Sequence, residues 1–353
     1  MNPFSLQIKI GNKKIGDHSP VFIVAELSGN HNHNFDIAVK TLKAIKDSGA
    51  DAVKLQTYTA DTLTINENNK YFRIKSGSLW YGKTLYDLYK EAYTPWEWHP
   101  KLQKIAQDLG LILFSTPFDE TATDFLDKMD VPVFKISSFE AVDPYFVNYV
   151  AAKKKPVFIS SGLTDLDDLY KIKKIFMRNG NNKLVFLKCT SLYPTPFKNT
   201  NLSAITTMRE KLKTLVGLSD HTLGINVPVA AVTLGARVIE KHFILDKKLG
   251  GPDSPFSLDF KEFKSMVKSI RQVEQALGNP SVVGKEKYNK SRPFSRSLFA
   301  VEDIKKGGRL TKKNIRSIRP GFGLAPKYYD KILGKKAQKF IKRGTPLSWD
   351  LIS

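Results

Sequence analysis

Cysteine is almost missing from this chain of 353 residues, which contains one, Cys189, within the apolar run 184–189. A disulfide framework is therefore excluded, and a single cysteine in a strand is more often a small buried residue than a nucleophile. Apolar runs of about 18 residues, long enough to cross a bilayer, are also missing. The first residues lack the cationic and apolar segments of a secretory signal. We therefore expect a soluble, cytoplasmic protein with no membrane partner.

Negative charge is scarce as well, because 56 Lys and Arg residues stand against 34 Asp and Glu residues, a net charge of +22. Clustered cations bind nucleic acid by releasing counterions from its phosphates. Here the lysines are spread along the chain and are not interleaved with the aromatic residues that stack on single-stranded bases. We expect no nucleic-acid partner and a solvated basic surface that steers an anionic small molecule. A polyanion-binding protein that uses its basic tail is the alternative from another class.

What the chain does contain is eight short runs of Val, Ile, Leu and Phe, each followed by a turn and a stretch of helical periodicity. Buried strands that alternate with helices predict a parallel sheet, and eight such units predict a closed (β/α)8 TIM barrel, an α/β fold. An open doubly wound sheet would need a GxGxxG turn after its first strand, which residues 25–30 lack. The expected strands are 21–25, 52–56, 111–115, 133–136, 156–160, 184–188, 215–218 and 238–243.

The rest of the chain predicts two domains. We expect the barrel at 1–280, a polar linker at 281–292 and a small domain at 293–353 that is rich in glycine turns. A domain of this size is marginal alone and needs support, either from the barrel or from the barrel of a second subunit. Residues 58–95 are too long for a simple connection, and we expect them to fold over the barrel mouth as a substrate loop.

Polar side chains end nearly every expected strand, and in a barrel of this kind such residues face a common pocket. His221 and His242 end the seventh and eighth strands, so two imidazoles could hold one metal ion there, although either could equally be a structural histidine that caps its strand. An open shell completed by water and substrate oxygens would suit Mn²⁺, Co²⁺ or Mg²⁺ better than a closed zinc site would.

Two lysines lie inside apolar strands, Lys54 and Lys135. A buried ammonium is costly unless an anion pairs with it, so these residues predict a pocket for a phosphate, or for a phosphate plus a carboxylate. The alternative is a structural ion pair with Glu26 or Glu140. The pair of histidines at His31 and His33 is typical of metal-dependent amidohydrolase barrels, but those enzymes also need histidines after strands five and six, where this chain has serine and threonine.

The motifs taken together resemble the sialic acid synthase family. They are AE at 25–26, KLQT at 54–57, STPFD at 115–119, KISSFE at 135–140, SDHT at 219–222, EKHF at 240–243, GGPD at 250–253 and FSL at 256–258. The tail is similar to the small domain called SAF or antifreeze-like, through AVEDIKKG at 300–307 and RPG at 319–321. The resemblance covers essentially the full length and implies a TIM barrel with a C-terminal SAF domain.

The resemblance implies a metal-dependent condensation of phosphoenolpyruvate with an acetamido sugar, with carbon–oxygen cleavage and release of phosphate. Residues 79–89 and the GGPDS segment at 250–254 are most similar to the branch of the family that makes pseudaminic acid from 2,4-diacetamido-2,4,6-trideoxy-L-altrose. Enzymes that make N-acetylneuraminic or legionaminic acid share the other motifs and stay as alternatives.

The resemblance also implies a role for each matching residue. Glu26 would stabilise the cationic carbon and handle the protons of the attacking water, and His221 and His242 would hold the metal and belong to the catalytic set. Arg319 would reach the sugar site of the partner subunit in a domain-swapped homodimer. The residues implied for phosphoenolpyruvate are Lys54, Thr116, Lys135, Ser138, Ser160 and Ser219, and those for the sugar are Glu140, Tyr193, Asp253 and Arg319.

Overall fold

The computed structural model describes residues 4–278 and 290–353. The chain divides into two compact units, Met1–Gly278 and Asn279–Ser353. Most of the linker expected at 281–292 lies outside the described residues. Among the described residues, no helix is both long enough and apolar enough to cross a membrane.

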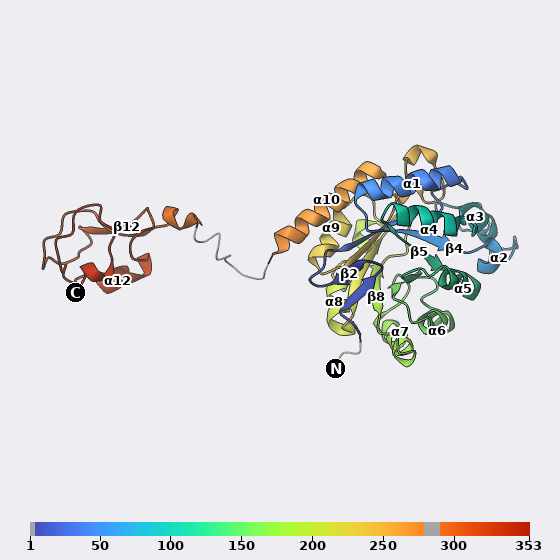
Figure 1. Ribbon diagram of the computed structural model, residues 1–353, viewed down its shortest axis with the longest axis horizontal. Coiled ribbons are helices and arrows are strands. Elements are labelled where there is room, and N and C mark those ends of the chain that lie inside the picture. The colour runs from blue at the N-terminus through green and yellow to red at the C-terminus, as the bar shows by residue number, and fades with distance from the viewer. Residues whose placement is uncertain (1–3, 279–289) are drawn as a thin grey trace. The chain divides into compact units, whose positions relative to one another are not determined.

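Eight parallel strands close into a barrel with the neighbour order β10-β3-β4-β5-β6-β7-β8-β9, and helices surround it (Figure 1). The expected barrel is therefore confirmed. Each expected run overlaps one of these strands, and the ends differ by at most two residues. The strands are β3 (Phe22–Glu26), β4 (Ala52–Thr57), β5 (Ile112–Pro117), β6 (Phe134–Ile136), β7 (Val157–Ser160), β8 (Leu184–Cys189), β9 (Leu215–Asp220) and β10 (Val238–His242).

Helices follow the strands in the regular βα alternation, and their ends are fixed by local chemistry. The Asn34 side chain accepts a hydrogen bond from the Ile37 amide and starts α1, and Gly49 ends it at a φ of 87°, which glycine adopts without strain. The helices of the barrel unit are α1 (Phe35–Ser48), α2 (Ala60–Leu63), α3 (Leu85–Ala92), α4 (Trp98–Asp108), α5 (Glu120–Lys128), α6 (Pro144–Ala152), α7 (Leu166–Arg178), α8 (Ala204–Leu212), α9 (Asn226–Thr233) and α10 (Phe260–Leu277).

The interior of the barrel is apolar at one end and polar at the other. Side chains alternate across a strand, so every second residue points inward. Near the strand starts, the inward residues form one apolar cluster that includes Phe22, Phe114, Phe158 and Val238. Near the carboxyl ends, the inward positions carry charged and hydroxyl side chains instead. The barrel thus has a dry lower half and a polar upper rim.

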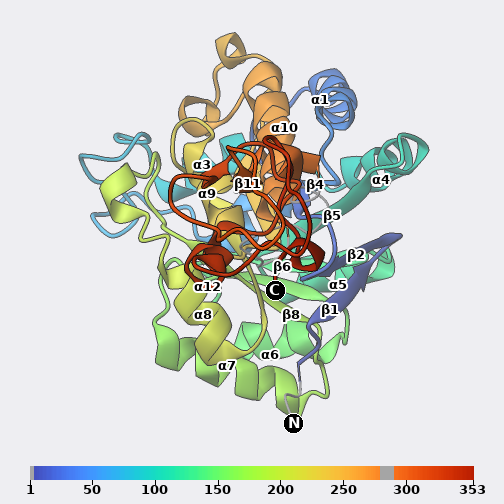
Figure 2. The same ribbon diagram turned by 90° about the vertical axis from the view of Figure 1, so that its left-hand side faces the viewer.

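An antiparallel hairpin of β1 (Gln7–Ile10) and β2 (Lys13–Gly16), drawn in dark blue in Figure 2, was missed by the sequence reasoning. Its buried side chains Ile8, Ile10 and Ile15 belong to the same apolar cluster as the lower interior of the barrel. The hairpin therefore closes the amino-terminal end of the barrel.

The second unit has its own apolar core, which includes Leu298, Ile315, Ile332 and Leu347. Its regular elements are short. They are the antiparallel pair β11 (Ser297–Ala300) and β12 (Ile315–Ile318), followed in the chain by the small helix α12 (Tyr329–Ile332). Isolated bridges such as Phe299 to Pro346 hold the rest together.

Candidate active site

A cavity of about 410 Å³ opens at the carboxyl ends of the barrel strands. This volume lies within the range of small-molecule sites. Of the thirteen residues proposed for the site from the sequence, twelve line it, namely Glu26, Lys54, Thr116, Lys135, Ser138, Glu140, Ser160, Tyr193, Ser219, His221, His242 and Asp253. The thirteenth, Arg319, is exposed directly after β12 in the second unit.

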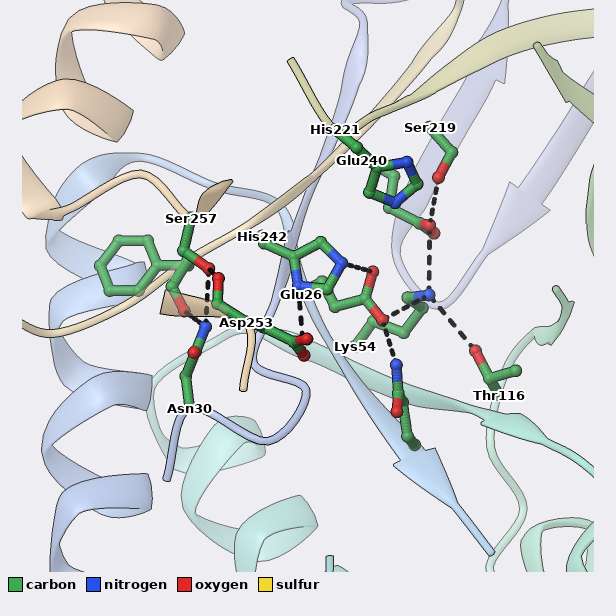
Figure 3. A network of polar contacts seen from close by, with 12 residues as sticks. Glu26, Asn30, Lys54, Thr116, Ser219, His221, Glu240, His242, Asp253 and Ser257 are labelled. Carbon is green, nitrogen blue, oxygen red and sulfur yellow. Dashed lines mark hydrogen bonds and ion pairs between the residues drawn. The ribbon is translucent and has the colours of Figure 1, made fainter. Parts of the chain in front are cut away.

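Four buried charges form the floor of this cavity, and Figure 3 shows three of them, Glu26, Lys54 and Glu240. Lys54 Nζ lies 3.0 Å from Glu26 Oε1 and 3.1 Å from Glu240 Oε1, and Lys135 Nζ lies 3.5 Å from Glu240 Oε1. All four side chains are at most 4% exposed, so solvent screens them little. The structural ion pair considered as an alternative is thus present for Lys54 and Glu26. Lys135 pairs with Glu240, while Glu140 accepts a hydrogen bond from Ser137.

The pKa values follow from burial and from this pairing. Burial alone would raise the pKa of Glu26, but Lys54, His242 and Lys135 lower it well below its usual range. Burial would lower the pKa of Lys54, but Glu240 and Glu26 raise it. Burial lowers the pKa of Lys135, and Glu240 only partly offsets this. Glu26 is therefore a carboxylate at neutral pH. Of the two lysines, Lys135 is the one whose positive charge is less well balanced by nearby carboxylates.

Two imidazoles face each other beside this floor, with the ring centroids of His221 and His242 5.4 Å apart. His242 Nε2 lies 3.3 Å from Glu26 Oε2, and its buried Nδ1 makes no hydrogen bond, with Asp253 Oδ2 at 3.8 Å. Burial lowers the pKa of His242, which favours the neutral form that a metal ligand needs. His221 Nδ1 is 3.9 Å from Cys189 Sγ.

The donor set fits a divalent ion with an open shell. Within 4–278 and 290–353, no group of three or more His, Cys, Asp or Glu side chains is arranged to hold a metal. The chain would therefore supply two imidazoles, and water or substrate oxygens would supply the remaining ligands. The orphaned Nδ1 of His242 is a free donor of the kind that such an ion requires.

Hydroxyl groups line the side of the cavity next to Lys135. Ser160 Oγ and Ser191 Oγ are buried without a hydrogen-bond partner, and the Gly162 amide donates to Ser138 Oγ at 3.0 Å. A Cβ at Gly162 would lie 2.2 Å from Ser191 Oγ and 2.6 Å from Ser138 Oγ, so only glycine fits. The unpaired hydroxyl of Ser160, in the same cavity lining as Lys135, is a suitable donor to a bound oxyanion.

A hydrogen-bonded clamp fixes Asp253 relative to His242 (Figure 3). Asn30 Nδ2 donates to the Phe243 carbonyl and to Ser257 Oγ, both at 2.9 Å. Ser257 Oγ donates in turn to the Asp253 carbonyl at 2.7 Å. The clamp joins the first βα loop to the end of β10 and to the turn that carries Asp253.

A second buried pair of charges lies on the outer face of β9 and β10, the strands that lead to His221 and His242. Lys241 Nζ contacts Asp220 Oδ2 at 2.5 Å and donates to the Thr222 carbonyl at 2.6 Å. Asp220 and Lys241 directly precede His221 and His242, and both side chains are at most 2% exposed. The pair therefore ties together the strand ends that present the two imidazoles.

Several residues of the cavity were missed as site residues. Glu240 is the most important, because it pairs with both lysines and accepts a hydrogen bond from Ser219 Oγ at 2.9 Å. The alternation of a strand contained the signal, since Glu240 lies two positions before His242 and must share its face. Gln56, Cys189 and Trp80 also line the cavity.

The histidines of the first loop lie elsewhere. His31 is fully buried, and its Nε2 lies 3.0 Å from Thr94 Oγ1, while His99 Nε2 lies 2.8 Å from Thr57 Oγ1. These contacts anchor the end and the beginning of the 58–95 segment. Neither His31 nor His33 lines the cavity.

Comparisons with known proteins find matches to both units of the chain. The NeuB family matches residues 41–282 and the SAF domain matches residues 295–353. The chain is 50% identical over 340 residues to pseudaminic acid synthase of Campylobacter jejuni, which spans 96% of this chain and 98% of that protein. It is 46% identical over 332 residues to pseudaminic acid synthase of Helicobacter pylori, spanning 94% and 97%.

More distant relatives include N,N'-diacetyllegionaminic acid synthase of Legionella pneumophila, which is 37% identical over 350 residues and matches over 97% of both chains. Among solved structures, N-acetylneuraminic acid synthetase from Leptospira borgpetersenii superimposes with a TM-score of 0.73 at 28% identity, over 81% of this chain and 95% of that one.

Proposed function

This chain belongs to the NeuB family, and from that premise we propose that it condenses phosphoenolpyruvate with 2,4-diacetamido-2,4,6-trideoxy-β-L-altrose and water to give pseudaminic acid and phosphate. The chain is then a transferase that forms a carbon–carbon bond. The choice of sugar rests on the relatives that are 46–50% identical over nearly the whole chain.

One observation carries the chemistry: two buried lysines, the unpaired hydroxyl of Ser160 and two facing imidazoles share one closed-ended cavity. Phosphoenolpyruvate carries a phosphate and a carboxylate, and both groups need compensation at such depth. We assign them to the floor, where Lys54 and Lys135 supply charge. Hydroxyls complete the pocket, and they come from Thr116, Ser138, Ser160 and Ser219.

We assign the sugar to the outer part of the cavity, with its aldehyde next to His221 and His242. A divalent ion bound there would supply Lewis acidity and orient the aldehyde oxygen, and Mn²⁺ is the ion that we expect, with Mg²⁺ or Co²⁺ as alternatives. Glu140, Tyr193 and Asp253 line the same part and would contact the sugar hydroxyl and acetamido groups.

Glu26 lies where the two substrates would meet. In the reaction, carbon 3 of phosphoenolpyruvate bonds to the aldehyde carbon and carbon 2 becomes electron-poor. Water then adds to carbon 2, and the tetrahedral intermediate collapses with cleavage of its bond from carbon to the phosphate oxygen. A carboxylate with a lowered pKa is suited to stabilise the positive carbon. When the phosphate engages Lys54, Glu26 loses part of that compensation and becomes a better base for the proton of the water.

The quaternary arrangement belongs to the same proposal. We expect a domain-swapped homodimer in which Arg319 of one subunit reaches the sugar site of the other. The support is the match of residues 295–353 to the SAF domain together with the exposure of the Arg319 side chain.

The test is to incubate the protein with phosphoenolpyruvate, Mn²⁺ and each candidate amino sugar, and to follow phosphate release before and after EDTA. We expect phosphate release with the altrose substrate and none with N-acetylmannosamine. EDTA should abolish the release. With ¹⁸O in the bridging oxygen of phosphoenolpyruvate, the label should leave with the phosphate. Lys54→Met should abolish release, whereas Lys104→Met, at a side chain 71% exposed, should not. Phosphate release that persists in Lys54→Met would contradict the assignment of phosphoenolpyruvate to the charged floor.

A further inference from the structure

The two sides of the cavity differ in chemistry. The barrel strands supply the charged floor described above. The 58–95 segment supplies the opposite side, and none of the described residues with which it lines the cavity is charged. Five of them, Leu63, Ile74, Trp80, Leu85 and Leu88, are large and apolar, and we call the last four the mouth wall.

The mouth wall is held in place rather than left loose. The Ile74 amide donates to the Lys83 carbonyl at 3.0 Å, and the Leu85 amide donates to the Phe72 carbonyl at 2.9 Å. These bonds flank an antiparallel bridge between Arg73 and Thr84, which fixes the stretch with Ile74 against the stretch with Leu85. The segment is also anchored to the barrel, because Trp80 Nε1 donates to the Pro252 carbonyl at 2.9 Å.

Trp80 connects the mouth wall to the reacting groups. Its ring centroid lies 5.7 Å from that of Tyr193, which in turn lies 4.5 Å from His221. A sugar whose aldehyde end is next to His221 must extend its other end outward, since the floor beneath is closed and occupied by phosphoenolpyruvate. Carbons 4 to 6 of the sugar therefore meet the apolar side of the cavity.

We infer that the mouth wall is the specificity determinant of this site and that it binds the methyl groups at the far end of the sugar, on carbon 6 and on the 4-acetamido group. This inference rests on the proposed function. Burying a methyl group is favourable by roughly 0.8 kcal/mol. A hydroxyl packed against these four side chains would lose water without gaining a partner, since three of them are aliphatic and Trp80 Nε1 already donates to the Pro252 carbonyl. The hydroxyls that this segment adds to the cavity lining belong to other residues, Tyr58, Ser78 and Tyr89. An apolar pocket of this kind discriminates against an added hydroxyl by roughly 100-fold.

The experiment compares kcat/KM for 2,4-diacetamido-2,4,6-trideoxy-L-altrose with that for its 6-hydroxy counterpart. The wild type should prefer the deoxy sugar by roughly 100-fold. Ile74→Thr places a hydroxyl in the wall, and this preference should fall by about tenfold with the KM for phosphoenolpyruvate unchanged. Leu85→Asn should act in the same direction.

Ile65→Thr is the matched control, because Ile65 lies in the same segment, is 57% exposed and does not line the cavity. It should keep the wild-type preference. An active wild type whose preference is the same in Ile74→Thr and Leu85→Asn would overturn this inference and leave the proposed function standing. A wild type that releases no phosphate with any of the sugars would remove the proposed function and this inference with it.

Discussion

The substitution Glu240→Gln tests the charged floor most directly, because it removes one negative charge and keeps the shape of the side chain. Glu240 Oε1 is 3.1 Å from Lys54 Nζ and 3.5 Å from Lys135 Nζ. At an effective dielectric constant near 20, each attraction is on the order of 5 kcal/mol. Lys54 keeps Glu26 as a partner, whereas Lys135 loses its ion pair.

Desolvation of the lost carboxylate offsets part of these attractions, and breaking a buried pair by removing one partner typically destabilises by about 3–5 kcal/mol. For a unit of this size, that corresponds to a fall in Tm of roughly 6–20 °C. Phosphoenolpyruvate brings negative charge to the uncompensated Lys135, so it should raise the Tm of Glu240→Gln by more than it raises that of the wild type.

Differential scanning calorimetry with and without phosphoenolpyruvate measures both effects. Glu91→Gln is the matched control, since the pair of Glu91 with Lys83 is exposed and such pairs contribute about 0–1 kcal/mol. If Glu240→Gln melts no lower than Glu91→Gln, the floor is not held together by this carboxylate and the reasoning is refuted.

Three further predictions follow from other parts of the molecule. Burial lowers the pKa of His31 to about 3 and that of His99 to about 4, so the unfolded chain binds more protons than the folded chain below pH 6.5. As the pH falls from 7 to 5, each residue should therefore lower the free energy of unfolding by roughly 2 kcal/mol. Urea titrations across this pH range should show a smaller fall in stability for His99→Gln than for the wild type. Lys241→Met should destabilise the fold by about 3–5 kcal/mol, because it leaves Asp220 buried without its partner, and should weaken Mn²⁺ binding measured by calorimetry. Adding Asp220→Asn should recover most of the lost stability, and no recovery would show that the broken Lys241–Asp220 pair is not the cause of the loss. Arg319→Ala should raise the KM for the sugar far more than the KM for phosphoenolpyruvate, and equal increases would indicate a folding defect instead.

The barrel could be predicted because its strands are buried on both faces. Such strands are continuous apolar runs, and each expected run matches one strand to within one or two residues at its ends. The polar rim followed from the same logic, since polar residues at the inward positions near the carboxyl end of such a run face the pocket. Lys54, Lys135 and His242 were recognisable for this reason.

The partners of these residues could not be predicted from the chain alone. Which carboxylate meets Lys135 depends on how far around the barrel β10 lies from β6, and that is a property of the closed sheet. The β1–β2 hairpin was missed because its four-residue strands alternate too briefly to stand out from an irregular segment. The contact of Trp80 with Pro252 spans 172 positions and leaves no local trace.

The β1–β2 hairpin that closes the amino-terminal end of the barrel has a kinetic consequence. With Ile8, Ile10 and Ile15 filling that end in the described part of the chain, substrates and products share a single entrance. In the proposed arrangement phosphoenolpyruvate takes the deeper position, so it would have to arrive before the sugar, and inorganic phosphate would depart only after the nine-carbon acid above it had gone. Turnover should accordingly follow an ordered sequential scheme, with phosphate inhibiting competitively against phosphoenolpyruvate.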